Sequence, residues 1–161
     1  MPQSRFEKIV FMFITVTISV TAFAIYNVAI SMGSMSNDVF PVAIKEIPIE
    51  FIFAFSLEVA FVYKAALRLA FQFVDPKKDR PELIILAITS MNVAIMCPAM
   101  SLIAAAIHNG INVNIISNWF QKMVFNFPFA FFTQIFFIGP LVRFIFRTIF
   151  RNNVIELEVK A

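Results

Sequence analysis

The stretch that decides the fold is KEIPIEFIFAFSLE, residues 45–58, because it places carboxyl groups inside a run of apolar residues. The run continues beyond Glu58 to Val62 and then ends in Tyr63, Lys64 and Arg68. A carboxylate in the hydrocarbon core of a membrane costs a few kcal/mol. Glu58 must therefore face a protein interior or a wet cavity, find a hydrogen-bond donor, or be protonated. Either it handles an ion or a substrate, or it joins two helices through one hydrogen bond.

The composition predicts an all-α, polytopic integral membrane protein. Of the 161 residues, 60% are hydrophobic and only 14% are charged, whereas soluble domains average about 25% charged residues. Apolar segments of about 20 residues, the length that crosses a bilayer, recur along the chain. We expect four transmembrane helices, at residues 9–32, 42–73, 83–107 and 117–146. Little chain is left over, so no separate soluble domain is expected.

The distribution of basic residues predicts the orientation of these helices. Of the 13 lysines and arginines, only Lys45 and Lys122 lie toward the side that holds the turns after the first and third segments. The positive-inside rule then places both termini and the central loop in the cytoplasm. The net charge of +3 is thereby explained by topology and contact with anionic lipid, and not by nucleic acid. The residues expected to hold lipid headgroups are Arg68, Arg143, Arg147 and Arg151.

The chain also repeats itself. The sequence FAFSLE at 53–58 matches FAFFTQ at 129–134. The repeat offset is the shift along the sequence that carries Phe53 onto Phe129. It also carries three polar positions onto three others, namely Glu46 onto Lys122, Glu50 onto Asn126 and Glu58 onto Gln134. Steps of four and eight residues keep each trio within about 120° of one helix face.

This repetition predicts one membrane domain, 1–161, made of repeat one, about 1–76, and repeat two, about 77–151. Two helices per repeat mean that both repeats enter the membrane from the same side, so we expect parallel repeats around an axis along the membrane normal. Glu58 would then face Gln134, and Glu50 would face Asn126. A carboxyl can share a hydrogen bond with an amide in either protonation state.

The first and third segments share a further spacing, in which small or polar residues follow each other at intervals of four, three and four. The two sets are Thr15, Ser19, Ala22 and Tyr26, and Ser90, Ala94, Cys97 and Ser101. Small residues on one stripe allow close helix approach. A packing seam is the interpretation favoured here.

Several classes of chemistry have no support in the sequence. There is no His-Glu-x-x-His motif, no glycine-rich phosphate loop and no serine or cysteine with a nearby base. Cys97 is the single cysteine, so neither an intramolecular disulfide nor a cysteine-based metal site can form. We expect no enzyme activity, no cofactor and no metal.

Five stretches carry a resemblance to a known family. They are Arg5–Phe11, Phe73–Lys78, Met96–Leu102, Asn126–Pro128 and Gly139–Arg147. With them the chain resembles domain-of-unknown-function family 2798, small bacterial membrane proteins with a two-helix unit present once or twice. The resemblance implies a bacterial inner-membrane location and tandem hairpins, and it brings no established activity.

In architecture the chain also resembles the proteobacterial antimicrobial-compound efflux family. That family has four helices in two tandem pairs and uses an intramembrane glutamate for proton coupling. Its aromatic and histidine-containing motifs are missing here, and the first helix carries no acid between Val10 and Met32.

The expected function is that of a small transporter or channel-like protein for a proton, a cation or a small substrate. It would use Glu58 and Glu50, with Gln134 and Asn126, near the repeat interface. Burial should keep Glu58 largely neutral at rest, because the charged form would lose hydration. The alternative is a non-transporting accessory or structural subunit that binds lipid or another membrane protein. Expected partners are the bilayer, its anionic headgroups, and a second copy or a partner membrane protein.

Overall fold

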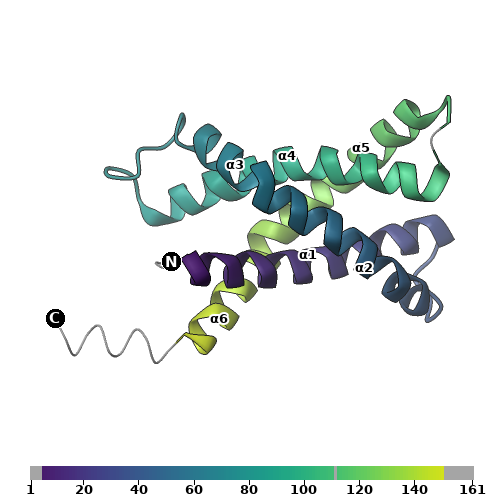
Figure 1. Cartoon of the computed structure of the whole chain (residues 1–161), viewed down its shortest axis with the longest axis horizontal. Coiled ribbons are helices and arrows are strands. Elements are labelled where there is room, and N and C mark those ends of the chain that lie inside the picture. Colours follow the sequence, from purple (N-terminus) through teal and green to yellow (C-terminus); the bar gives the residue numbers. More distant parts are fainter. Residues whose placement is uncertain (1–4, 111, 151–161) are drawn as a thin grey trace.

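The computed structural model of this chain describes residues 5–110 and 112–150, apart from the side chains of 107–109, and this part is helical without strands (Figure 1). The expectation of an all-α chain is thereby confirmed. The helices are α1 (Arg5–Met32), α2 (Val39–Leu57), η1 (Glu58–Val62), α3 (Tyr63–Ala70), α4 (Pro81–Asn109), α5 (Ile115–Thr133), η2 (Gln134–Ile138) and α6 (Gly139–Ile149).

Two of the helical stretches are continuous across several labels. The segments α2, η1 and α3 join without a break, and so do α5, η2 and α6, where η1 and η2 are single π-helical turns. The second helix therefore runs from Val39 to Ala70, and residues 71–73, expected to be helical, form a turn. The π turns were not foreseen from the sequence.

Glycine and proline set several helix ends. Gly33 follows α1 with a φ of 74°, and Gly110 follows α4 with a φ of 68°. These left-handed conformations stop a helix at no steric cost only for glycine. Pro81 begins α4 after the extended residue Arg80, because the first helical position does not need a backbone N–H.

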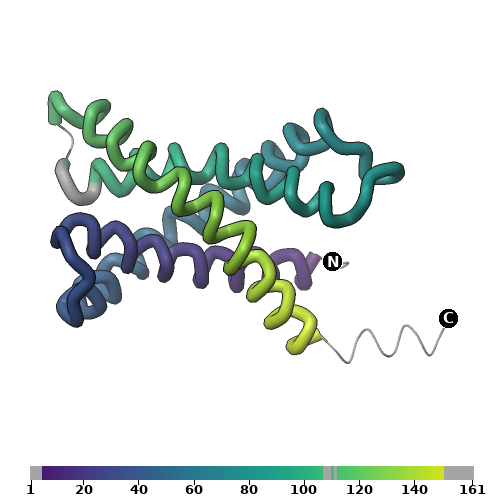
Figure 2. The backbone as a smooth tube through the Cα atoms, turned by 180° about the vertical axis from the view of Figure 1, so that it is seen from behind, coloured from purple at the N-terminus to yellow at the C-terminus, as the bar shows by residue number. Residues whose placement is uncertain are grey.

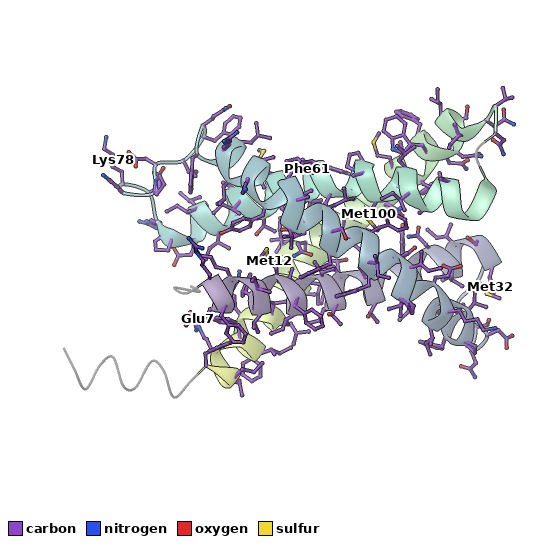
Figure 3. All side chains as sticks on the ribbon, viewed as in Figure 1. Glu7, Met12, Met32, Phe61, Lys78 and Met100 are labelled. Atoms are coloured by element: carbon purple, nitrogen blue, oxygen red, sulfur yellow. The ribbon has the colours of Figure 1, made fainter. Side chains whose placement is uncertain are left out.

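The four helical stretches form two antiparallel hairpins that run in the same direction. The turns after α1 and α4 lie at one end of the molecule, as both backbone views show (Figures 1 and 2). The start of α1, the loop between α3 and α4, and the end of α6 lie at the other end. Glu7 and Lys78 mark this second end, and Met32 marks the first (Figure 3).

Within the described residues, three helices are long and apolar enough to cross a membrane: Arg5–Met32, Pro81–Ala106 and Ile115–Ile149. The stretch from Val39 to Ala70 is not among them. Charged residues interrupt it throughout, namely Lys45, Glu46, Glu50, Glu58, Lys64 and Arg68. The fourth span therefore stays a prediction.

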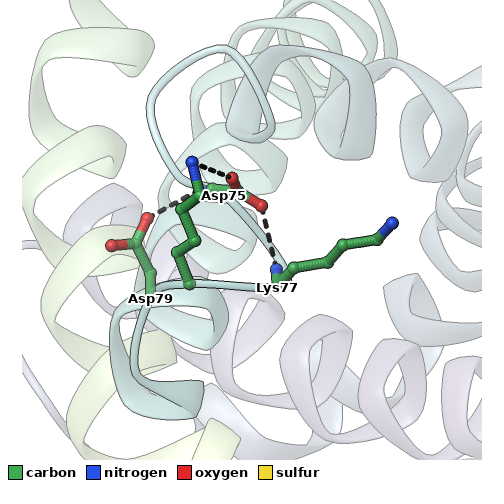
Figure 4. Close-up of polar contacts among 4 residues, drawn as sticks. Asp75, Lys77 and Asp79 are labelled. Atoms are coloured by element: carbon green, nitrogen blue, oxygen red, sulfur yellow. Dashed lines mark hydrogen bonds and ion pairs between the residues drawn. The ribbon is translucent and has the colours of Figure 1, made fainter.

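The loop between α3 and α4 is organised by its own side chains (Figure 4). The Asp75 carboxylate accepts a hydrogen bond from the Lys77 N–H at 2.9 Å and lies 3.8 Å from the Lys78 amine. Asp79 accepts the N–H of Asp75 at 2.6 Å. These contacts are exposed, and exposed ion pairs contribute at most about 1 kcal/mol. They shape the loop more than they stabilise the protein.

The π turns keep one face of each long helix toward the interior. The buried residues of the second stretch follow at steps of four: Glu50, Ala54, Glu58, Val62, Ala66 and Ala70. In a straight α-helix, 20 residues at about 100° each would rotate the last position away by roughly 200°. One extra residue in a π turn reduces this drift to roughly 100°. The bulge thus helps Glu58 and Ala66 to share a face.

Proline explains one of the two π turns. Pro140 is the second residue after η2, and it lacks the N–H that an α-helical bond would need and crowds the preceding turn. The widened turn is closed by a bond from the Gly139 N–H to the Gln134 carbonyl. The η1 turn has no such proline, and its closing bond runs from Tyr63 to Glu58.

The buried positions of the first hairpin recur in the second. Shifted by the repeat offset, five of the eight buried residues of the Val39–Ala70 stretch fall on buried counterparts, at Asn126, Ala130, Ile138, Val142 and Phe146. The other three, Val39, Ala43 and Glu58, fall on half-buried residues. The same shift carries the start of η1 onto the start of η2. Buried residues of α1 are Val16, Val20, Ala24, Asn27 and Val28, and a shift one residue longer carries them onto the buried residues Val93, Cys97, Ser101, Ala104 and Ala105 of α4.

This register corrects the one expected for α1 and α4. The expected match paired Thr15 with Ser90 and Ser19 with Ala94, a shift one residue shorter than the repeat offset. Ala94 is exposed in the structure, whereas the longer shift, which pairs Val16 with Val93, places buried residues on buried residues. The expected match aligned small and polar residues of the two helices. The residues that are buried are instead mostly valine and alanine, which pack between α1 and α2 and between α4 and α5.

Candidate functional site

A cavity of about 210 Å³ lies between the helices and collects most of the polar groups of the interior. Its walls come from α1, α2, η1, α3, α4, α5 and η2, and Met12 and Met100 lie on it near the middle of the molecule (Figure 3). The polar lining residues are Thr15, Ser19, Asn27, Glu50, Glu58, Tyr63, Thr89, Asn92, Ser101, Asn126 and Gln134. The remaining lining is apolar or sulfur-containing.

The four residues expected to form the site all line this one cavity. Glu50, Glu58 and Asn126 are buried, with exposed fractions of 5%, 7% and 4%, and Gln134 is half-buried. They lie on the two long return helices, at positions that the repeat offset relates to each other. The sequence pattern therefore brought together residues that are also together in space.

Asn92 is the hydrogen-bond partner of Glu58. The Asn92 amide, on α4, donates to both carboxylate oxygens of Glu58, at 2.8 and 3.0 Å. Asn92 therefore provides the amide hydrogen bond to Glu58 that was expected from Gln134. Sequence reasoning missed Asn92, although an asparagine within the apolar segment 83–107 was a signal of the same kind as Glu58.

Gln134 has a different partner. The Ser19 hydroxyl, on α1, donates to the Gln134 side-chain oxygen at 3.1 Å. The expected direct pair of Glu58 with Gln134 is thus replaced by two crossed contacts. In each of them a polar residue at the start of a π turn bonds to the first helix of the other hairpin. The π turns therefore aim their first side chains across the molecule, into the cavity.

The second pair of expected residues lies toward the end of the cavity that is near the α1–α2 turn. The Asn126 amide donates to the Ser101 hydroxyl of its own hairpin at 3.3 Å, and Ser101 lies 4.0 Å from the Cys97 sulfur. Glu50 interacts electrostatically with Glu46 and with Lys122 of the other hairpin. Glu46 and Lys122 are related by the repeat offset, so equivalent positions carry opposite charges that attract each other.

The chemistry that these groups allow is the binding of a proton or a cation. A buried carboxyl bonded by a neutral amide can hold either one and can release it when water enters. Among the described residues, no group of three or more histidine, cysteine, aspartate or glutamate side chains is arranged to hold a metal ion.

The arginines expected to hold lipid headgroups lie at the end of the molecule that carries the α3–α4 loop. Arg68 and Arg147 are exposed, and Arg143 is half-buried. Arg143 and Arg147 are one turn apart on α6. Arg151 lies outside the described residues.

Removing the Asn92 amide should destabilise the protein, because Glu58 would stay buried without its donor. We expect Asn92→Ala to lower the free energy of unfolding by about 1–3 kcal/mol. Asn92→Asp should cost more, since two carboxyl groups would then face each other. Urea unfolding in detergent micelles measures both, and equal stability of Asn92→Asp and the unmodified protein would contradict the bond.

Taken together, the helices of membrane-spanning length and the shared polar cavity define a class, that of all-helical proteins with an interior carboxyl site. Comparison with known proteins gives one match, to the second half of the chain. Residues 83–150, which include the second helical hairpin, match the model of a family described as a domain of unknown function, DUF2798. No curated protein and no solved structure matched the chain.

Proposed function

We propose that the protein is a four-span membrane transporter or channel-like protein that moves a proton, a cation or a small substrate past Glu58 and Glu50. The observation that carries this proposal is the central cavity lined by both carboxyl groups. Ionisable side chains within membrane spans are costly to bury and commonly mark ion or substrate pathways.

The fourth span is the continuous helix from Val39 to Ala70, which exceeds the roughly 20 residues that a span requires. Its charges have places compatible with a membrane. Glu50 and Glu58 face the cavity, Lys45 and Glu46 lie toward one end, and Lys64 and Arg68 lie toward the other. Lysine and arginine near span ends extend to the interface.

The two hairpins are proposed to be tandem repeats related by an axis along the membrane normal. Three features support this: the recurrence of buried positions from one hairpin to the next, the paired π turns, and the parallel directions of the hairpins in Figures 1 and 2. Repeat interfaces near the middle of the membrane are where transporters build their sites.

The proposed location is the bacterial inner membrane, with both ends of the chain and the α3–α4 loop in the cytoplasm. Most basic residues of the described chain lie at that end, as the positive-inside rule requires. Arg68, Arg143 and Arg147 would contact anionic headgroups there, at about 1 kcal/mol each. Analysis of the lipids that co-purify with the protein tests this contact, and a composition equal to that of the bulk membrane would contradict it.

The orientation can be tested with single cysteines in a Cys97→Ser background. A membrane-impermeant thiol reagent added outside intact cells should label Ser36→Cys, in the α1–α2 turn, and leave Lys78→Cys unlabelled. Lys78→Cys should react after the membrane is broken. Labelling of position 78 but not of position 36 from outside would reverse the proposed topology.

The alternative is an accessory subunit that binds lipid or another membrane protein without transport. Flux of protons or cations through purified protein in liposomes separates the two. Flux that Glu58→Gln removes supports the transporter, and wild-type liposomes no more permeable than empty ones support the accessory subunit.

A further inference from the structure

We propose that the cavity takes a small monovalent organic cation, of the alkylammonium or arylammonium class, in exchange for a proton on Glu58. This inference rests on the proposed function and names the substrate class of the same site. Its basis is the chemistry of the lining: the sign of its charge, the nature of its other groups and its size.

The sign of the charge favours a cation. The lining contains the carboxyl groups of Glu50 and Glu58, and no lysine, arginine or histidine occurs among the described residues that form it. Lys122 is not part of the lining, and its charge interacts with Glu46 and Glu50. An anion would therefore meet only negative or neutral groups in a water-poor site, where repulsion is strong.

The rest of the lining favours an organic cation over a metal ion. Glu50 and Glu58 are eight residues apart on one helix, which is about 12 Å along the axis, so they cannot both coordinate one ion. Hard inorganic cations take about six to eight oxygen ligands. The other walls are mostly apolar, with Phe11, Phe23 and several aliphatic residues, which suit the carbon groups of an organic cation.

Aromatic rings strengthen this preference. Phe11 and Phe23 of α1 and Tyr63, one residue after the η1 turn, line the same space as Glu58. Ring faces attract ammonium groups, and more strongly where water is excluded. A carboxylate combined with aromatic walls is a suitable environment for an alkylated ammonium group.

The size of the cavity limits the ligand. A volume of about 210 Å³ corresponds to roughly seven water molecules at about 30 Å³ each. Pockets for drug-sized ligands span about 300–1,000 Å³. The ligand should therefore contain on the order of ten non-hydrogen atoms.

Exchange with a proton follows from charge balance. With Glu58 protonated, the carboxyl is neutral and holds one proton. When a cation enters, that proton leaves to water and the carboxylate pairs with the cation, so the net charge of the site is unchanged. One cation is thus bound for each proton released, and a lower pH weakens cation binding.

Three probes of nearly equal shape test the inference: phenyltrimethylammonium, its neutral isostere tert-butylbenzene, and benzenesulfonate. Titration calorimetry of the full chain in nanodiscs, with empty nanodiscs subtracted, measures binding. Repeating the titration in buffers of different ionisation enthalpy measures proton release. We expect the cation to bind at least about tenfold more tightly than either other probe and to release about one proton.

Variants assign this binding to Glu58. Glu58→Gln should weaken cation binding at least about tenfold and remove proton release, whereas Glu82→Gln, an exposed acid at the start of α4, should change neither. If Glu58→Gln does not fold, the wild-type protein still tests the inference, because its affinity for the cation must fall as pH is lowered. Equal binding of the neutral isostere, or affinity independent of pH, would overturn the inference.

One outcome separates this inference from the proposed function. If no cation binds but proton flux in liposomes still depends on Glu58, the substrate class is wrong and the transporter remains. If neither flux nor cation binding occurs, both fail.

Discussion

Glu58→Gln is expected to abolish pH-coupled flux in proteoliposomes while the protein stays folded. Glutamine has nearly the shape of the protonated acid, and Asn92 can still donate to its oxygen. The substitution therefore keeps the contact between η1 and α4 and removes only the group that exchanges a proton or cation. Because no other carboxyl among the described lining residues lies within one turn of Glu58, we expect a loss of at least about 100-fold, the lower range for losing a proton-transfer group.

The measurement is the initial rate of change in internal pH after an imposed gradient, compared among wild type, Glu58→Gln and the exposed control Glu82→Gln. Thermal unfolding of the same samples shows whether each variant is folded. Wild-type flux in a folded Glu58→Gln protein would remove Glu58 from the pathway. A misfolded Glu58→Gln protein with unaltered residual flux would make the site structural.

A one-residue deletion should have opposite effects inside and outside the η1 turn. A π turn is an α-helix with one extra residue, so deleting the exposed residue Ala60 should restore an α-helix and leave Ala54 and Ala66 in place. Deleting the exposed residue Phe53 instead rotates Glu50 and everything before it by about 100° relative to Ala54. We expect a loss of about 1 kcal/mol or less for the first deletion and more than about 4 kcal/mol for the second.

Urea unfolding in micelles measures both deletions, and folded yield gives a second readout. We also expect the Ala60 deletion to lower the flux of a protein that still folds, because it narrows the turn that directs Glu58 toward Asn92. Equal destabilisation by both deletions would show that the π turn is not an insertion in an otherwise regular helix.

The sequence predicted the helical class and the site on the return helices for one physical reason. Carboxyl and amide groups in apolar helices have few tolerable positions, so Glu50, Glu58, Asn126 and Gln134 had to face the interior. The structure places all four on one cavity. Their shared spacing at multiples of four was enough to put each set on one helix face.

The sequence could not predict which polar side chains form hydrogen bonds across helices. Contacts between Glu58 and Asn92, and between Ser19 and Gln134, depend on how far each helix is rotated and shifted. The unforeseen π turns change that rotation by a whole residue. The expected register of α1 against α4 was wrong for a similar reason. Alanine, valine and serine can all pack between two helices, and the sequence does not show which of them is buried.

The most direct test of the account is whether the cavity is reached by water and attracts cations while the outer face of the same helix does not. Thr15 lines the cavity and Thr17 is exposed on α1, and each donates to the carbonyl four residues earlier. In a Cys97→Ser background, Thr15→Cys and Thr17→Cys are treated in proteoliposomes with a cationic methanethiosulfonate reagent and with its anionic counterpart. The account predicts that Thr15→Cys reacts, faster with the cationic reagent, and that Thr17→Cys, facing lipid, reacts with neither. Equal reaction at both positions, or no reaction at Thr15→Cys in a protein that reacts fully once denatured, would contradict it.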